Sequence, residues 1–452
     1  MGSDKAELTH VAGTFLIQAE GAFLNGAGLG EGEDRNVTVP KTFRNGRSEV
    51  PYVSAQAWKR WLRTTAIQEA GWSASEPQAI GWNPKGNVNK IAGQLNPVMF
   101  PEDDIFGYMR AQEGQGKRKA ADEGDEEEDA GTTRAIMRSS PFMASLLISL
   151  RSNGWRGDDE GFVHLTKFDP KALAEAEIEK FLSAILGTSK EKKDKWKRLE
   201  SVDANWAAEV KTLAEKPDIV ALRETLLSKA TEKGVELKLN AITPLPYSTR
   251  FYNTHLQGIF CLDYGRLGLF WNIGDRVELE DAKAKSFLKD GVIEEVTTQH
   301  PYVSFTQNGK LGRVYRLADK SERKKRAQTL FKALAVLRGG AKQAQFGTDI
   351  APKAIIVAGL TCGNPIFNHL FEVDSDSGQP VLNINALQEI AKDYANRIVT
   401  PIFVGIRTGY LKNENEVRTL TTKPIAQGNG TAIEVKVFTP IAAANSIGEL
   451  LP

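Results

Sequence analysis

Apolar residues recur along this 452-residue chain in patterns that predict both strands and helices. Alternating or continuous apolar runs are typical of strands, and apolar residues repeated every three to four positions are typical of helices. Strands are predicted at residues 12–24, 251–270, 354–373 and 398–406, with a short buried element at Pro141–Leu150. Helices are predicted at residues 54–68, 321–337 and 387–398. We therefore expect an α+β fold.

Two long segments interrupt this pattern. Residues 71–168 begin with a stretch rich in Gly, Asn and Pro, and contain a charged stretch at 111–135 with too few apolar residues to offset the entropy of ordering. We expect a disordered acidic loop there. Residues 169–234 are rich in Ala, Glu, Lys and Leu, and predict helices at 172–186, 192–213 and 218–233. The predicted organisation is a core of residues 1–70 and 235–452, a first insertion at 71–168 and a helical insertion at 169–234.

Without the insertions, the order of strands and helices resembles the βαββαβ ferredoxin-like plan that RNA-recognition modules use. Because many unrelated functions occur on that plan, function has to be read from the side chains.

The charges of the chain are unevenly placed. It carries 58 Lys and Arg residues against 57 Asp and Glu, for a net charge of +1. Residues 35–63 hold seven basic side chains and one acid, and residues 300–350 hold eleven basic side chains and three acids. Residues 113–129 instead hold eight acids and three basic side chains. Two basic blocks in a neutral protein indicate a local surface for a polyanion; the alternative is two solvated charge runs.

The helix predicted at 54–68 carries the most specific signal. Ser54 is expected to be its N-cap. At 100° per residue, one side of the helix presents an amide and three cations, and the opposite side presents Trp58, Trp61, Leu62 and Thr65. No acid in this helix face pairs with the cations, so they are expected to contact phosphates and not bases. An ordinary amphipathic surface helix is the alternative. The candidate residues, with three cations of the preceding loop, are Gln56, Lys59, Arg60, Arg63, Lys41, Arg44 and Arg47.

Two further segments are candidates for the same surface. Gly339 and Gly340 follow the basic helix and would let a backbone approach a phosphate, with Lys342 and Gln343 as donors. A simple helix stop is the alternative. The stretch Tyr247–His255 is polar and aromatic, and can stack on bases or form a plain β-hairpin.

Other classes of function are disfavoured by composition. The chain has two cysteines, Cys261 and Cys362, and five histidines, which excludes a disulfide scaffold and a four-cysteine zinc site. No apolar run approaches the ~20 residues of a membrane span, and no export signal is recognised, so a cytoplasmic location is expected. The Gly-rich loop at 26–30 does not match a dinucleotide-binding motif. We expect no cofactor, no metal and no catalytic residues.

Five stretches of this sequence, in the same order, resemble a known family. They are Thr14–Gly30, Val39-Pro-Lys-Thr-Phe leading to Val53–Arg63, Asp104–Met109 with Arg138–Met143, Thr249–Leu262, and Gly339–Gln343. The chain resembles the backbone subunit of the CRISPR Cascade complex, in the Cas-seven superfamily and its type I-B DevR-like autoregulator branch. The second stretch is the most specific. The resemblance departs at Ala55, where the family often has a second Ser, and gives no counterpart for the acidic loop or the helical insertion.

The resemblance implies a modified RNA-recognition palm with finger-like insertions and a thumb hairpin near residues 243–256. It implies a non-catalytic subunit whose copies stack as a helical filament along the spacer of a CRISPR RNA and present it to a target DNA strand. Other Cascade subunits are implied as partners: a guide-end cap, a large subunit, a small subunit and a repeat-processing endonuclease. The residues expected to contact RNA by position are Lys41, Ser54, Gln56, Lys59, Arg60, Arg63, Lys342 and Gln343, with Arg250 and Phe251 on or near the thumb.

Two other functions stay open. One is a metal-dependent RNA endonuclease or RNA-processing enzyme on the same fold, with His255 or the acids at 103–104 and 158–160 as candidates. The other is a single-strand RNA-binding module that works alone.

Overall fold

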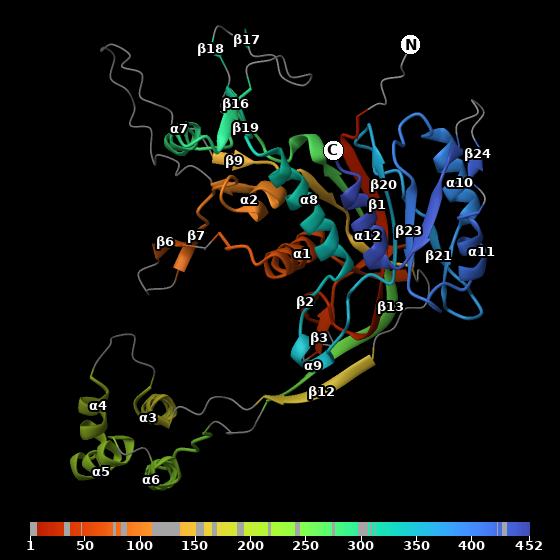
Figure 1. The fold of residues 1–452 in the computed structure, drawn as a ribbon. Coiled ribbons are helices and arrows are strands. Elements are labelled where there is room, and N and C mark those ends of the chain that lie inside the picture. Colours follow the sequence, from red (N-terminus) through yellow and green to blue (C-terminus); the bar gives the residue numbers. More distant parts are fainter. Residues whose placement is uncertain are drawn as a thin grey trace, which may run out of the picture. The chain divides into compact units, whose positions relative to one another are not determined.

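The larger part of the chain is built on a sheet whose central strand is β1 (His10–Ala22) (Figure 1). The computed structural model describes residues 7–30, 37–46, 48–75, 78–82, 88–110, 136–150, 158–164, 170–187, 194–215, 218–239, 245–273, 276–296, 306–307, 310–311, 313–422, 424–426 and 432–452. These residues form two units, one from residues 1–159 and 250–452 and one from residues 160–249.

Strand β1 pairs antiparallel with β13 (Leu245–Asp263) on one side and β20 (Ala354–Leu360) on the other. The strand order is β26-β23-β20-β1-β13-β11-β5-β4. From Val11 to Ile17 every residue of β1 is buried, and this stretch is apolar except for Thr14, as expected for a strand covered on both sides. The other described strands of this sheet are β2 (Gly26–Leu29), β3 (Val37–Pro40), β4 (Thr42–Asn45), β5 (Ser48–Val53), β10 (Phe142–Ala144), β11 (Leu147–Ser149), β12 (Asp158–His164), β23 (Ile402–Ile406) and β26 (Val435–Phe438).

Helices cover both faces of this sheet (Figure 1). On one face, α1 (Ala55–Ala70), α8 (Lys320–Ala335) and α12 (Pro440–Glu449) close a core in which Trp58 meets Phe15 edge-on, with ring centroids 5.3 Å apart. On the other face, α10 (Ile384–Asp393) and α11 (Glu414–Thr419) pack over β1, β20 and β23. Each face therefore has its own apolar core.

A smaller sheet in the same unit joins strands from distant parts of the sequence. Its order is β16-β19-β14-β15-β9-β8, and its core contains Phe270, Leu279 and Tyr315. We call this sheet, with α2 and α7, the finger. Its elements are α2 (Pro101–Phe106), β8 (Tyr108–Arg110), β9 (Ile136–Arg138), β14 (Leu269–Ile273), β15 (Arg276–Val277), α7 (Asp281–Lys289), β16 (Ile293–Glu295) and β19 (Arg313–Leu317).

The other elements of this larger unit are short ribbons and one short helix. They are β6 (Gln78–Trp82) with β7 (Val88–Ala92), β17 (Thr306–Gln307) with β18 (Lys310–Leu311), α9 (Gln343–Phe346), β21 (Phe371–Val373) with β22 (Pro380–Leu382), and β24 (Ile425–Ala426) with β25 (Ala432–Ile433).

The second unit is helical and has its own core. Its helices are α3 (Pro170–Leu186), α4 (Lys195–Val202), α5 (Ala204–Glu215) and α6 (Ile219–Glu232). Phe181, Leu222 and Leu226 are buried among them. The single helix predicted at 192–213 is wrong, because Asp203 is extended and its side chain accepts from the Trp206 amide, which starts a new helix.

The α+β class and the helix with Ser54 as its N-cap are confirmed. Several predicted boundaries are wrong. The Gly-rich loop at 26–30 instead contains strand β2, paired with β3. The strand predicted at 251–270 ends at Asp263, where a 3-10 turn and Gly268 at φ +70° send the chain into the finger sheet. The predicted strand at 354–373 ends at Leu360. The acidic loop at 111–135 lies outside the described residues.

The bounds of the last two predicted elements also differ. Helix α10 begins three residues earlier than predicted because the Asn383 side chain accepts from the Ala386 amide as an N-cap, and it ends at Asp393. The strand predicted at 398–406 begins at Ile402.

Candidate nucleic-acid interface

The start of α1 is held next to the end of β1 by one asparagine. The Asn25 side-chain oxygen accepts from the Ser54 amide at 3.0 Å, and the Asn25 carbonyl accepts from the Lys41 amide at 2.8 Å. Ser54 Oγ accepts from the Ala57 amide at 3.4 Å, which completes the N-cap. The structure therefore brings Lys41 and Ser54, two predicted site residues, to the same end of the helix.

The glycine loop after α8 packs against the same helix. A Cβ atom at Gly339, whose φ is +149°, would lie 2.3 Å from Trp61 Cγ, so only glycine fits there. The Ala341 amide donates to the Leu24 carbonyl at 3.0 Å, and the Lys342 ammonium lies 5.4 Å from the ring centroid of Phe23. Two basic segments almost 300 residues apart in sequence thus form one surface.

The four polar residues of α1 do not have equal access to a ligand. Gln56 and Arg60 are exposed, and no ion pair or hydrogen bond joins either side chain to another described residue. Lys59 is half-buried: its ammonium donates to Ser140 Oγ and to the Phe142 carbonyl, both at 3.0 Å. Burial lowers the pKa of Lys59. Its ammonium is therefore already engaged within the protein.

Arg63 is paired with acids from the finger. Its guanidinium lies 3.0 Å from Asp103 Oδ1 and 3.7 Å from Glu102 Oε1, both on α2. The expectation that no acid pairs with the α1 cations is therefore wrong for Arg63. The sequence could not reveal these partners, because Arg63 and Asp103 are 40 positions apart and only the tertiary fold brings them together.

A cleft of about 660 Å³ separates α1 from the finger. Arg60 and Gln56 line it from α1, and the finger side includes two aromatic residues and an exposed methionine. It is a mixed-charge cleft and not a purely basic groove. Its lining includes Gln56, Lys59, Arg60, Arg63, Glu102, Asp103, Phe106, Tyr108 and Met109.

The predicted thumb residues also have partners within the protein. Arg250 makes a two-pronged ion pair with Asp159, with N–O distances of 2.8 and 3.0 Å. Phe251 packs against Phe346, with ring centroids 5.9 Å apart, at the end of the short helix that follows Lys342. Strand β13 and the glycine loop are therefore joined through these two rings.

Three other predicted site residues are placed as follows. The Gln343 side-chain amide donates to the Gly339 carbonyl of its own loop. Arg44 is exposed on β4, opposite Glu49 in register. Arg47 lies outside the described residues.

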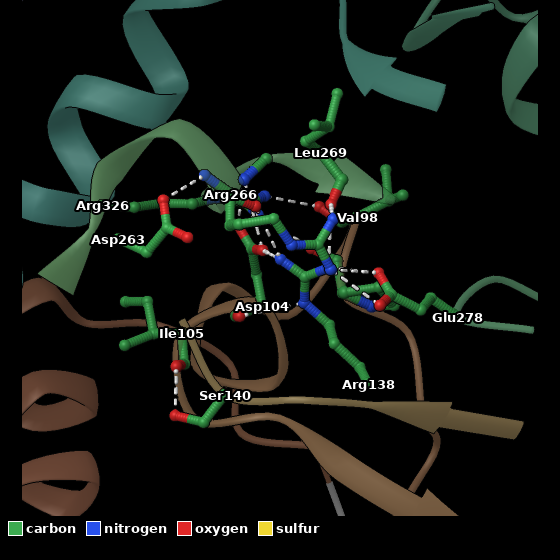
Figure 2. A network of polar contacts seen from close by, with 12 residues as sticks. Val98, Asp104, Ile105, Arg138, Ser140, Asp263, Arg266, Leu269, Glu278 and Arg326 are labelled. Atoms are coloured by element: carbon green, nitrogen blue, oxygen red, sulfur yellow. Dashed lines mark hydrogen bonds and ion pairs between the residues drawn. The ribbon is translucent and has the colours of Figure 1, made fainter. Parts of the chain in front are cut away.

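A buried ionic network that the sequence did not predict joins the finger to α8, which packs on the larger sheet (Figure 2). Asp104 pairs with Arg138 and with Arg326 of α8, the latter at 2.8 Å, and also accepts from the Gly268 amide. Glu278 pairs with Arg138 at 2.8 Å and Arg266 at 2.7 Å. Asp104, Arg138 and Glu278 are almost completely buried. Charges buried in this way must be mutually paired, so the network fixes α2 and β9 against α8 and β14.

Three of the residues considered for catalysis have hydrogen-bond or ion-pair partners within the protein. Both carboxylate oxygens of Asp104 are occupied by guanidinium and amide donors. His255 shares a 3.0 Å hydrogen bond with the Tyr410 hydroxyl, and Asp159 holds Arg250. In the part of the chain that the structure describes, no group of three or more His, Cys, Asp or Glu side chains is arranged to hold a metal ion.

Most of the second basic block is used inside the protein. Lys324 donates to the Leu451 carbonyl at 2.7 Å, and Arg323 lies over the Tyr264 ring at 4.4 Å. Lys332 and Arg338 both pair with Glu69 of α1. Of this block, Lys342 lies in the surface described above. None of the described helices has the length and apolar character that crossing a membrane would require.

Comparison with known proteins finds only limited structural similarity. No family model matches this chain, and no curated protein matches it. The chain is similar to a chain of a solved structure described as a CRISPR RNA-guided surveillance complex, with 10% identity and a TM-score of 0.42 over 98% of this chain and 99% of that one. It is also similar to a chain of a pre-nicking CRISPR RNA-guided surveillance complex, with 10% identity and a TM-score of 0.43 over 98% and 100%. At these values, neither likeness establishes the family of this chain.

Proposed function

We propose that this chain is a non-catalytic CRISPR RNA-binding backbone subunit of a type I Cascade effector, of the I-B DevR-like branch. Its copies would line a guide RNA and present it to a target DNA strand, together with the other subunits of that complex. The observation that carries the proposal is that Lys41, Ser54 and Lys342 are held together at the start of α1, where the second and fifth stretches of the family resemblance meet.

The order of the elements supports the RNA-recognition part of the proposal. Along the chain the order is β1, α1, β11, β13, α8 and β20, and across the sheet it is β20, β1, β13 and β11. Each neighbouring pair is antiparallel. A βαββαβ unit has this chain order, and α1 and α8 lie together on one face of the sheet.

The side chains suit contact with a sugar–phosphate backbone. Arg60 and Lys41 supply charge, Gln56 supplies a neutral amide, and the Gly339–Gly340 turn lets the main chain approach closely. A guide RNA has to keep its base edges free for pairing, so the protein should hold phosphate and leave sequence recognition to base pairing. The proposed contacts meet that requirement because they are independent of base identity.

Co-expression with a CRISPR array tests the proposal. The purified protein should carry stoichiometric small RNA of uniform length, seen as a raised 260 to 280 nm absorbance ratio and a single band on a denaturing gel. Arg60→Ala should reduce the bound RNA. Arg397→Ala, which removes an exposed arginine after α10, is the matched control and should not. Purified protein without RNA would contradict the proposal. Bound RNA of mixed length, drawn from cellular transcripts in general, would contradict it as well.

The non-catalytic assignment is tested separately. Incubation of the complex with Mg²⁺ and labelled RNA should leave the RNA intact. Mg²⁺-dependent cleavage that His255→Ala abolishes would favour the endonuclease instead.

A further inference from the structure

A second cleft, of about 550 Å³, lies where the end of α1 meets α8 and α12. It is separate from the proposed RNA surface, because the 16 residues of α1, or roughly 24 Å of helix, lie between Ser54 and the cleft residue Trp72. The Gln328 amide of α8 donates to the Gly448 carbonyl of α12 at 3.2 Å, which holds these two walls together. The volume of the cleft is within the range of sites that hold a small molecule.

Arg326 brings an unused hydrogen-bond donor to the wall of this cleft. The residue exposes only 3% of its surface. Its Nη1 atom donates to Asp104 and to the Pro97 carbonyl, and its Nη2 atom donates to the Val98 carbonyl. Its Nε atom is buried too, and has no acceptor among the described residues. Because a buried donor without an acceptor costs free energy, a ligand that supplies one here would be stabilised.

The charges near this donor favour an anionic acceptor. The ion pairs of the buried network join three guanidinium groups to two carboxylates, which leaves one positive charge without a counter-charge in those pairs. Lys325 and Lys332 of α8 are exposed at the cleft. Each makes one surface ion pair, with Glu322 and Glu69 respectively, and such pairs are weak enough to exchange for a ligand. A phosphate group would supply the acceptor and the charge together.

The rest of the lining matches the sugar and base of a nucleotide. Trp72 is partly exposed at the cleft, and an indole ring is a surface on which a nucleobase stacks. Glu322 and Glu449 supply acidic oxygens of the kind that accept from ribose hydroxyls. The side chains of Thr329 and Asn445 have no hydrogen-bond partner among the described residues and are available to a ligand. A simple anion would use neither the indole nor the acids.

We infer that this cleft binds a free nucleotide, with its phosphate held by Arg326 and the two lysines and its base stacked on Trp72. The occupant is a small molecule and not the guide RNA, because the cleft lies at the opposite end of α1 from the surface that Lys41 and Lys342 form. Binding would satisfy Arg326 and thereby strengthen the network that joins the finger to α8. The inference goes beyond the proposed function and does not depend on it.

Isothermal titration calorimetry of the full chain with adenosine monophosphate (AMP) tests the site. AMP should bind, whereas adenosine, which lacks the phosphate, and inorganic phosphate, which lacks the base, should each bind at least about tenfold more weakly. Trp72→Ala should weaken AMP binding by about tenfold or more, because the stacking surface is lost. Lys325→Ala should weaken it severalfold. Lys436→Ala is the matched control, since Lys436 is a similarly placed surface lysine that pairs with Glu434 outside the cleft.

The outcomes that would overturn the site are distinct. The wild type might be titrated with AMP into the millimolar range without heat of binding, or inorganic phosphate could equal AMP in affinity. An equal loss in Lys325→Ala and Lys436→Ala would show a general charge effect. Displacement of AMP by an excess of short single-stranded RNA would place AMP on the RNA surface instead. Circular dichroism checks the fold, and if Trp72→Ala is unfolded, Lys325→Ala decides the result.

Discussion

The sharpest prediction concerns which cation of α1 contacts phosphate. The helix face alone suggests three equivalent cations, Lys59, Arg60 and Arg63. Among the residues that the structure describes, Arg60 is the one of the three without a partner, since Lys59 bonds Ser140 and Phe142 and Arg63 pairs with Asp103. Single-stranded nucleic acid releases about 0.7 counterions for each phosphate contact, and this number is the slope of log affinity against log salt.

Arg60→Ala should therefore flatten the salt slope by about 0.7, and the triple Ala variant by about 0.7 and not by about 2. Lys59→Ala should leave the slope unchanged. It should instead lower the free energy of unfolding by about 2 kcal/mol, because two hydrogen bonds from a partly buried ammonium are lost. RNA affinity at several salt concentrations gives the slopes, and urea unfolding gives the stability.

The reasoning would be refuted if Lys59→Ala flattened the slope as much as Arg60→Ala. Lys59 would then leave Ser140 and Phe142 to bind the RNA. Arg397→Ala serves again as the control for removal of an exposed charge.

The other predictions concern stability and the glycine loop. Burial raises the pKa of Glu102, so the folded state binds the Glu102 proton more tightly than the unfolded state does. Stability therefore falls as the pH rises above 4.5, the pKa of this carboxyl in the unfolded chain. Glu102→Gln should therefore raise the thermal unfolding temperature at pH 7 and lose this gain below pH 4.5; an equal change at both pH values would contradict the cause. Asp104→Ala leaves two buried guanidinium groups without their shared partner and should cost roughly 3–5 kcal/mol in urea unfolding, whereas a normal stability would mean that the network rearranges. Gly339→Ala should change Trp61 fluorescence and weaken RNA binding, because its Cβ would overlap the indole; unchanged emission would show that the loop moves without strain.

The sequence by itself determined the features that depend on near neighbours. The 3.6-residue period placed Trp58 and Leu62 in the core, and Ser54 was recognised as an N-cap because a hydroxyl just before a helix satisfies a free amide. The low apolar content of the acidic stretch and the helical composition of residues 169–234 were equally local properties. Such signals persist whatever the rest of the chain does.

The tertiary structure alone decided how charges are used. The local sequence does not distinguish Arg60 from four other charged residues, Lys59, Arg63, Asp104 and Arg326. Each of these four is engaged by a residue at least 40 positions away in the chain. The finger sheet likewise combines strands from two separated stretches of sequence. Charge pattern gives no pairing information over such distances, because any acid can meet any base. Only the tertiary packing, which brings α2 and the segment Ser140–Phe142 to α1 and brings α8 to α2, decided which of these charges are engaged within the described residues.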